Sequence, residues 1–199
     1  MLRAREFTSF DVAAVVRELK ATIIDSRVNN VYQQEGNILI LKLHKPNMPT
    51  FQLVLEAGRR FNVTAYASEK PSAPPAFCMA LRKYLRNSWL KGIEQFEFER
   101  VVVFSFSSQT GILRLVCEFF GDGNIVLVGE DEKILHALHY KRMRDRNVVR
   151  GEVFRFAPPF GKNPLKVGKE ELSAGLRASG KVEVVRAFSR LLGVGGIYA

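Results

Sequence analysis

Cysteine is scarce in this sequence, and the few cysteines present are not arranged as metal ligands. The 199 residues include two cysteines, Cys78 and Cys117, which lie far apart and each stand among apolar neighbours. Neither belongs to a CxxC pair or a cysteine–histidine cluster, so no zinc site or other metal site is expected. We expect both residues to be buried free thiols.

Long apolar segments are also missing. No apolar run approaches the roughly 20 residues that a helix needs to span a bilayer. The first residues, Met1–Glu6, lack the apolar stretch of a secretory leader. We therefore expect a cytoplasmic protein with no membrane partner.

Acidic residues are too few to balance the basic ones. Thirty Lys and Arg face twenty Asp and Glu, which gives a formal charge of +10. Such an excess favours polyanionic partners, because binding releases their condensed counterions. Charge alone does not distinguish RNA from DNA or from an anionic membrane, and it also serves solubility.

Enzyme signatures are absent. The chain has no P-loop, no dinucleotide fingerprint and no GxSxG elbow. The glycine-rich run 193–196 follows a helical pattern, where a phosphate cradle would follow a strand. The histidines His44, His136 and His139 lack metal-ligand spacing to a carboxylate. We expect no catalytic residue, no cofactor and no small-molecule substrate.

The pattern of apolar residues predicts an α+β fold. A helix should begin at Thr8–Asp11 and end near residue 25 or 26, and a second should cover 76–87. Runs rich in β-branched residues, bounded by turn residues, predict strands at 28–31, 38–43, 51–55, 61–65, 96–107, 113–119, 124–128 and 134–139. Their alternation predicts a two-layer β-sandwich.

The last forty or so residues have a different character. A proline-containing linker at 157–164 precedes two short helical patterns, 169–178 and 182–192, and the run 192–199 resembles the turn of a helix-two-turns-helix element. We therefore expect one domain over residues 1–160 and the start of a helical domain over 161–199. Because the sequence stops inside that element, a fragment of a longer protein is expected.

Basic residues alternate with aromatic ones in several places. RNA-binding proteins combine Arg and Lys on phosphates with stacking on aromatic rings. The candidate RNA-binding residues are Arg27, Arg82, Lys83, Arg86, Lys141, Arg142 and Arg144. The alternative for any one cluster is a solvated charged face. Arg27 has a structural alternative of its own, at the entry to a strand.

Five ordered motifs resemble the RqcH/NEMF family, also called NFACT or fibronectin-binding A proteins. They are the helix 11–19, the strand 27–32, the helix 77–85, the pair Glu99-Arg100 and the strand 123–127. The resemblance implies the family's amino-terminal fold, a β-sandwich similar to that of formamidopyrimidine-DNA glycosylases followed by a helix-hairpin-helix-like domain. It implies no glycosylase activity, because the chain begins Met1-Leu2-Arg3 and lacks the proline nucleophile.

The resemblance also implies a function. Members bind the split large ribosomal subunit, contact rRNA and recruit tRNA, mainly alanyl-tRNA, for untemplated carboxy-terminal tailing. Three residues match the family's functional positions: Asp11, Glu99 and Arg100, with glutamate replacing the usual aspartate at Glu99. Asp11 has an alternative role as a helix-capping residue at position N3, and Glu99 and Arg100 have one as an ordinary ion pair.

Two other functions compete with this one. The older family name suggests an adhesin that binds fibronectin, although the chain has no leader and no disulfide pattern. The glycosylase-like fold suggests a DNA-repair protein, against which the missing nucleophile argues.

Overall fold

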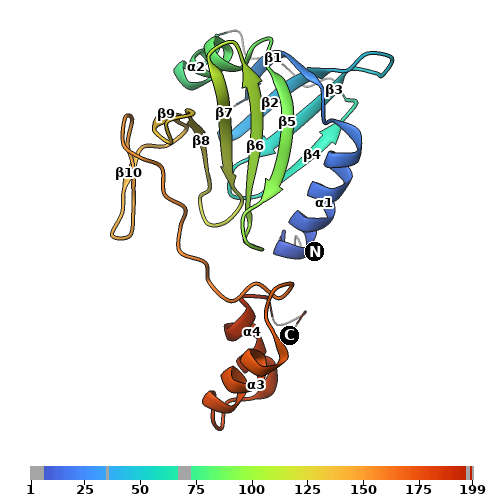
Figure 1. Cartoon of the computed structure of the whole chain (residues 1–199). Helices are drawn as coiled ribbons and strands as arrows, with labels where there is room; N and C mark the ends of the chain where they lie inside the picture. The colour runs from blue at the N-terminus through green and yellow to red at the C-terminus, as the bar shows by residue number, and fades with distance from the viewer. Residues whose placement is uncertain (1–6, 35, 67–72, 196–197, 199) are drawn as a thin grey trace.

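The structure is a computed structural model that describes residues 7–34, 36–66, 73–195 and 198. Figure 1 shows a large sheet with two helices and, beyond a linker, a second pair of helices. The helices are α1 (Ser9–Thr22), α2 (Ala76–Leu85), α3 (Lys169–Ala178) and α4 (Val184–Leu192). The strands are β1 (Arg27–Gln33), β2 (Ile38–His44), β3 (Phe51–Glu56), β4 (Arg60–Thr64), β5 (Trp89–Gln95), β6 (Val101–Ser108), β7 (Gly111–Glu118), β8 (Asn124–Val128), β9 (Ile134–Ala137), β10 (Lys141–Arg142) and β11 (Asn147–Val148).

Nine of the strands form one antiparallel sheet in the order β4-β3-β2-β1-β5-β6-β7-β8-β9. Its two halves meet where Arg27 of β1 pairs with Trp89 of β5, and backbone hydrogen bonds between residues 25–28 and 87–90 flank this pair. In a flat sheet, β4 and β6 would lie about 24 Å apart, because four strands separate them. The rings of Phe61 in β4 and Phe104 in β6 are 6.2 Å apart. The sheet is therefore strongly curled, and its two halves face each other across a common core.

Both sheet helices cover this core with residues at helical spacing. Helix α1 buries Val12, Val16 and Leu19, and α2 buries Cys78, Leu81 and Leu85. The second cysteine, Cys117, is also buried, and both thiols are free. The predicted α+β class and the predicted state of the cysteines are confirmed. The predicted two-layer β-sandwich differs from the structure in one respect: both layers belong to one continuous, curled nine-stranded sheet.

The predicted strand 96–107 is wrong in its first half. A separate strand, β5, precedes it, and residues 96–100 form a turn before β6 begins at Val101. The β5–β6 pairing has a bulge between Leu90 and Gly92, which breaks the alternation by which a strand is recognised in a sequence. The first helix is also shorter than predicted, since it ends at Thr22 and Asp25 has a left-handed φ of 63°.

The backbone of the linker packs tightly against the backbone at the end of α4. A Cβ added to Gly161 would lie 2.1 Å from the backbone nitrogen of Gly193, so only glycine fits there. Gly193 itself ends α4 with a left-handed φ of 63°. The predicted helix-two-turns-helix element is not established, because residues 196, 197 and 199 lie outside the described residues. Residues 1–6 also lie outside them. The boundary at 160/161 stays a prediction.

None of the described helices is long and apolar enough to cross a membrane.

Candidate nucleic-acid interface

A strained turn presents Glu99 and Arg100. The preceding residues Glu97 and Phe98 have φ angles of 51° and 143°, which residues other than glycine rarely adopt. Gln95 holds the turn by donating from Nε2 to the carbonyls of both Ser9 and Glu99, each at 3.0 Å. Backbone strain of this kind costs about 1–3 kcal/mol and is often found at functional sites.

Arg100 lies at the meeting point of two hollows. One, of about 330 Å³, is bounded by the start of α1, the turn, the linker and the end of α4. Its lining residues are Thr8, Ser9, Phe10, Glu99, Arg100, Phe160, Ser189, Gly193, Val194, Gly195 and Tyr198. The other, of about 380 Å³, lies between the start of β6 and the prolines of the linker. Arg100, Glu99 and Phe160 line both.

The two residues of the pair have different partners. Glu99 accepts a hydrogen bond at Oε1 from the backbone N–H of Phe160, at 2.7 Å. Arg100 donates from Nη1 to the carbonyl of Phe7 at 3.5 Å, the outer limit for such a bond. Glu99 therefore fixes the linker, while the guanidinium stands beside the positive end of α1. That combination suits an anionic ligand such as a phosphate.

Asp11 is the helix cap that the sequence allowed as an alternative. Its Oδ2 accepts from the backbone N–H and from the hydroxyl of Thr8, at 2.8 and 2.7 Å. Its own N–H donates to Thr8 Oγ1 at 3.3 Å, which completes a capping box. Asp11 does not line the hollow, but its partner Thr8 does. A role in RNA binding stays a prediction.

Loss of the capping box should lower stability without unfolding the protein. We expect Thr8→Ala and Asp11→Ala each to reduce the free energy of unfolding by about 1 kcal/mol, because the first removes the acceptor of the Asp11 N–H and the second that of the Thr8 N–H. Urea denaturation followed by circular dichroism measures this. Asp11→Asn, which keeps an acceptor oxygen, is the matched control and should lose less than Asp11→Ala. Equal stability of all four proteins would show that the capping box contributes nothing.

The candidate basic residues near α2 do not all point outward. Arg82, a candidate RNA-binding residue, has partners within the fold: its Nε donates to the carbonyl of Val31 at 2.7 Å and its Cζ lies 5.5 Å from the centre of the Tyr32 ring. Arg27 donates to the side chain of Asn87 at 2.8 Å. Lys83 and Arg86 are exposed. Arg82 is thus partly structural, and the neighbouring cations are left at the surface.

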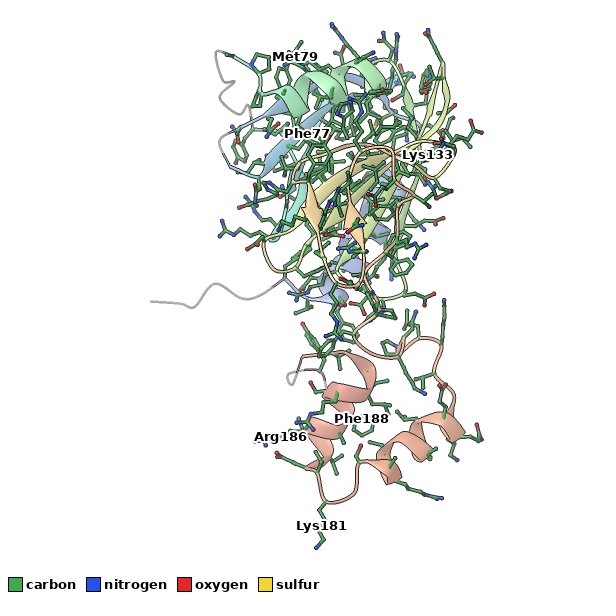
Figure 2. The ribbon with its side chains drawn as sticks, turned by 90° about the vertical axis from the view of Figure 1, so that its left-hand side faces the viewer. Phe77, Met79, Lys133, Lys181, Arg186 and Phe188 are labelled. Carbon is green, nitrogen blue, oxygen red and sulfur yellow. The ribbon has the colours of Figure 1, made fainter. Side chains whose placement is uncertain are left out.

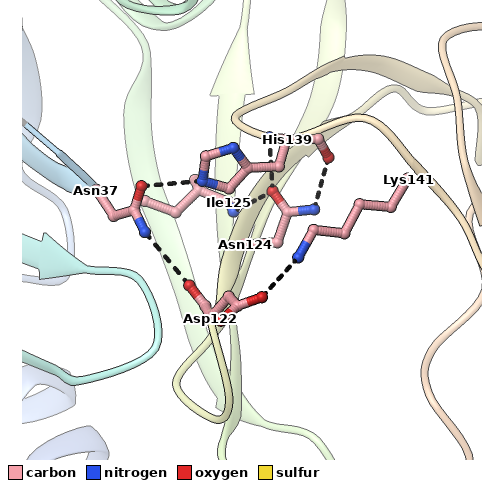
Figure 3. Close-up of polar contacts among 6 residues, drawn as sticks. All are labelled: Asn37, Asp122, Asn124, Ile125, His139 and Lys141. Atoms are coloured by element: carbon pink, nitrogen blue, oxygen red, sulfur yellow. Dashed lines mark hydrogen bonds and ion pairs between the residues drawn. The ribbon is translucent and has the colours of Figure 1, made fainter.

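The remaining basic candidates lie on an arm formed by residues 140–150, whose β10 and β11 pair with each other. Figure 3 shows how its root is held: Asn124 accepts from the backbone N–H of His139 at 3.0 Å and donates to its carbonyl at 2.9 Å. His139 Nε2 meets Asn37 Oδ1 at 2.9 Å. Lys141 pairs with Asp122 at 3.3 Å. The arm therefore leaves the sheet in a fixed direction.

A buried ion pair holds the arm a second time. Arg146 Nη1 lies 2.6 Å from Glu118 Oε1 at the end of β7, and the two side chains are only 5% and 7% exposed. The same Nη1 donates to the carbonyl of Arg155 at 3.3 Å. Arg142 and Arg144, between the two anchors, are exposed.

Sequence reasoning missed the residues that complete the hollow. Phe160, Ser189 and Tyr198 carry no motif and come from segments far from Glu99 in the chain. The one available signal was the proline-rich linker itself. Among the described residues, no cluster of His, Cys, Asp and Glu could hold a metal ion.

Comparison with known proteins supplies the family. A family model described as NFACT N-terminal and middle domains matches residues 8–199. The archaeal Rqc2 homolog aRqcH of Methanocaldococcus jannaschii is 38% identical over 98% of this chain, which corresponds to 30% of that relative. The human ribosome quality control complex subunit NEMF is 34% identical over 68% of this chain and 12% of its own length. The chain thus spans less than a third of these relatives.

Solved structures agree with the fold. The N-terminal domain of the fibronectin-binding protein PavA from Streptococcus pneumoniae superposes with a TM-score of 0.82, at 27% identity, over 96% of this chain and 76% of that one. The N-terminal part of the fibronectin/fibrinogen-binding protein from Streptococcus suis gives a TM-score of 0.83 at 25% identity, with the same coverage.

Proposed function

This chain belongs to the NFACT N-terminal family, and from that membership we propose that it is a non-catalytic, RNA-binding part of a ribosome quality-control factor. In this proposal it acts in the cytoplasm on the split large ribosomal subunit. There it contacts rRNA and supports recruitment of tRNA, mainly alanyl-tRNA, for untemplated tailing. The ribosome itself forms the peptide bonds.

The observation that carries the proposal is the position of Arg100. Arg100 lines two hollows and lies on a strained turn that Gln95 and Glu99 tie to α1 and to the linker. Such a site is prepared before a ligand arrives, so little ordering is needed on binding. We assign the tRNA contact to Arg100, a positioning role to Glu99 and a supporting role at the rim to Asp11 through Thr8. The likeness to the glycosylase sandwich and the helix-hairpin-helix interpretation of α3 and α4 belong to the same proposal.

The names of the solved relatives favour a second candidate, the binding of fibronectin. Surface labelling of intact cells tests it directly. Labelling of this protein outside the cell would support it, and strict protection from the label would end it.

Salt dependence of tRNA binding tests the proposed function. For a tRNA held through phosphates, the logarithm of the association constant should fall linearly with the logarithm of salt concentration, losing roughly 0.7–0.9 per phosphate contact. We expect a slope that corresponds to several contacts, measured by fluorescence anisotropy with labelled tRNA. No measurable affinity at low salt would contradict the proposal.

A further inference from the structure

We propose that α2 and the arm (residues 140–150) together form a second nucleic-acid surface, which binds the phosphate backbone of double-stranded RNA. Helix α2 lies at the other end of β5 from the Arg100 hollow, and the arm reaches back along the sheet to Glu118, whose strand partner Val101 follows Arg100. The inference rests on the proposed function only in choosing RNA over DNA. The surface itself follows from the positions and charges of the side chains.

Residues of α2 and of the arm converge on β9. The ring of Tyr84 in α2 lies 5.8 Å from the imidazole of His136 in β9. Burial lowers the pKa of His136, and the positive charges of Arg150 and Lys83 lower it further. The N–H of Gly151, which follows Arg150, donates to the carbonyl of Ile134 in β9 at 2.8 Å, so α2 and the end of the arm both contact this strand. Figure 1 shows α2, β9 and the arm following one another along the same side of the sheet.

The charges on these segments are almost all positive. Residues 76–93 contain four Lys and Arg and no acidic residue, and residues 134–151 contain five Lys and Arg and one acidic residue. Some of these cations have carboxylate partners, as Lys141 and Arg146 do. No ion pair to a described residue is formed by the exposed cations Lys83, Arg86, Arg142, Arg144 and Arg150. A polyanion is the partner that such a surface fits.

The aromatic rings favour double-stranded over single-stranded RNA. Proteins that hold single strands stack bases on exposed rings. Here Arg82 lies over the ring of Tyr32, and Lys83 Nζ is 5.8 Å from the centre of the Tyr84 ring. Cations therefore already occupy these two rings, while Tyr140 at the start of the arm is 52% exposed. Double-stranded RNA is bound mostly through phosphates and 2′-hydroxyls, and a firmly anchored arm can follow its backbone.

The α2 side of the new surface is separate from the Arg100 hollow. Strand β5 begins at Trp89, close after α2, and ends at Gln95, whose side chain is bonded to Ser9 beside the hollow. Its seven residues span about 20 Å. One molecule can therefore hold a tRNA at Arg100 and a second RNA segment, such as a helix of the large subunit, at α2 and the arm.

Charge removal from this surface tests the inference. We compare the 199-residue chain with its Lys83→Gln/Arg150→Gln variant in anisotropy titrations with an RNA duplex of about 16 base pairs, the span of a common double-strand-binding domain. The control, Arg177→Gln/Lys181→Gln, removes the same charge from exposed residues of α3 and the following turn. In Figure 2, Lys181 and Met79 of α2 lie at opposite ends of the molecule.

The surface variant should lose at least tenfold in duplex affinity at low salt, and its salt slope should fall by about two, one for each lost phosphate contact. The control should keep the duplex affinity of the parent. Equal losses in both variants, or tighter binding of DNA duplex or of phosphatidylserine vesicles, would each overturn the inference. If duplex binding behaves as expected but tRNA does not bind at all, the proposed function fails and this surface stands.

Discussion

Arg100→Ala is expected to weaken tRNA binding about tenfold to a hundredfold, the largest functional loss that any single substitution in the hollow should cause. Arg100 lines both hollows, and its Nη1 donates to the carbonyl of Phe7 just before α1. A lost arginine contact to nucleic acid costs about 1–3 kcal/mol. The salt slope should fall by about one, since one phosphate contact disappears. Anisotropy titrations with labelled tRNA at several salt concentrations measure both quantities.

Two further variants show what Arg100 contributes. Arg100→Lys keeps the charge but loses the planar pair of donors, so it should restore the salt slope and only part of the affinity. Glu99→Gln keeps an acceptor for the N–H of Phe160 and should bind tRNA nearly as well as the parent. Arg177→Ala, which removes an exposed cation of α3, is the matched control. An Arg100→Ala protein that binds tRNA as tightly as this control would refute the assignment.

Arg146→Met is expected to lower the free energy of unfolding by about 3–5 kcal/mol. Arg146 and Glu118 are both buried, and removing the cation leaves a buried carboxylate without its partner. The Nε of Arg146 is buried without a hydrogen-bond acceptor among the described residues, so the pair itself is imperfectly satisfied. In a domain of this size the melting temperature should fall by roughly 6–20 °C. Thermal melting and urea denaturation check this.

The double variant Arg146→Met/Glu118→Leu separates the pair from the packing around it. Replacing both partners with apolar residues should recover most of the lost stability, because no buried charge remains. The arm should then be held by fewer polar contacts, and duplex RNA affinity should fall while tRNA affinity does not. A single variant as stable as the parent would show that the ion pair is not buried as the structure places it.

Helices and strands that begin or end at residues with a clear local preference were predicted from the sequence. The Thr8–Asp11 spacing predicted the start of α1, and the capping box is present. The bounds of β8 and α3 were predicted to the residue. The turn at 96–100 was not predictable, because Glu97 and Phe98 adopt positive φ angles without glycine. Tertiary contacts hold that turn, and they leave no local pattern in the sequence.

In the candidate site, too, some residues could be predicted from the sequence and others depend on tertiary contacts. Resemblance to the family singled out Glu99 and Arg100, but the hollow around them depends on a linker sixty residues further on and on the end of α4. Arg82 could not be distinguished from Lys83 in the sequence, because both lie on one helix. Only the fold brings the carbonyl of Val31 within reach of Arg82.

Crosslinking of the full-length protein to RNA in living cells, followed by sequencing of the bound RNA, tests whether tRNA and large-subunit rRNA are its partners. We expect strong enrichment of tRNA together with large-subunit rRNA, and loss of the tRNA fraction in the Arg100→Ala protein. Enrichment of messenger RNA or of no RNA class, or a tRNA fraction unchanged by Arg100→Ala, would contradict this expectation.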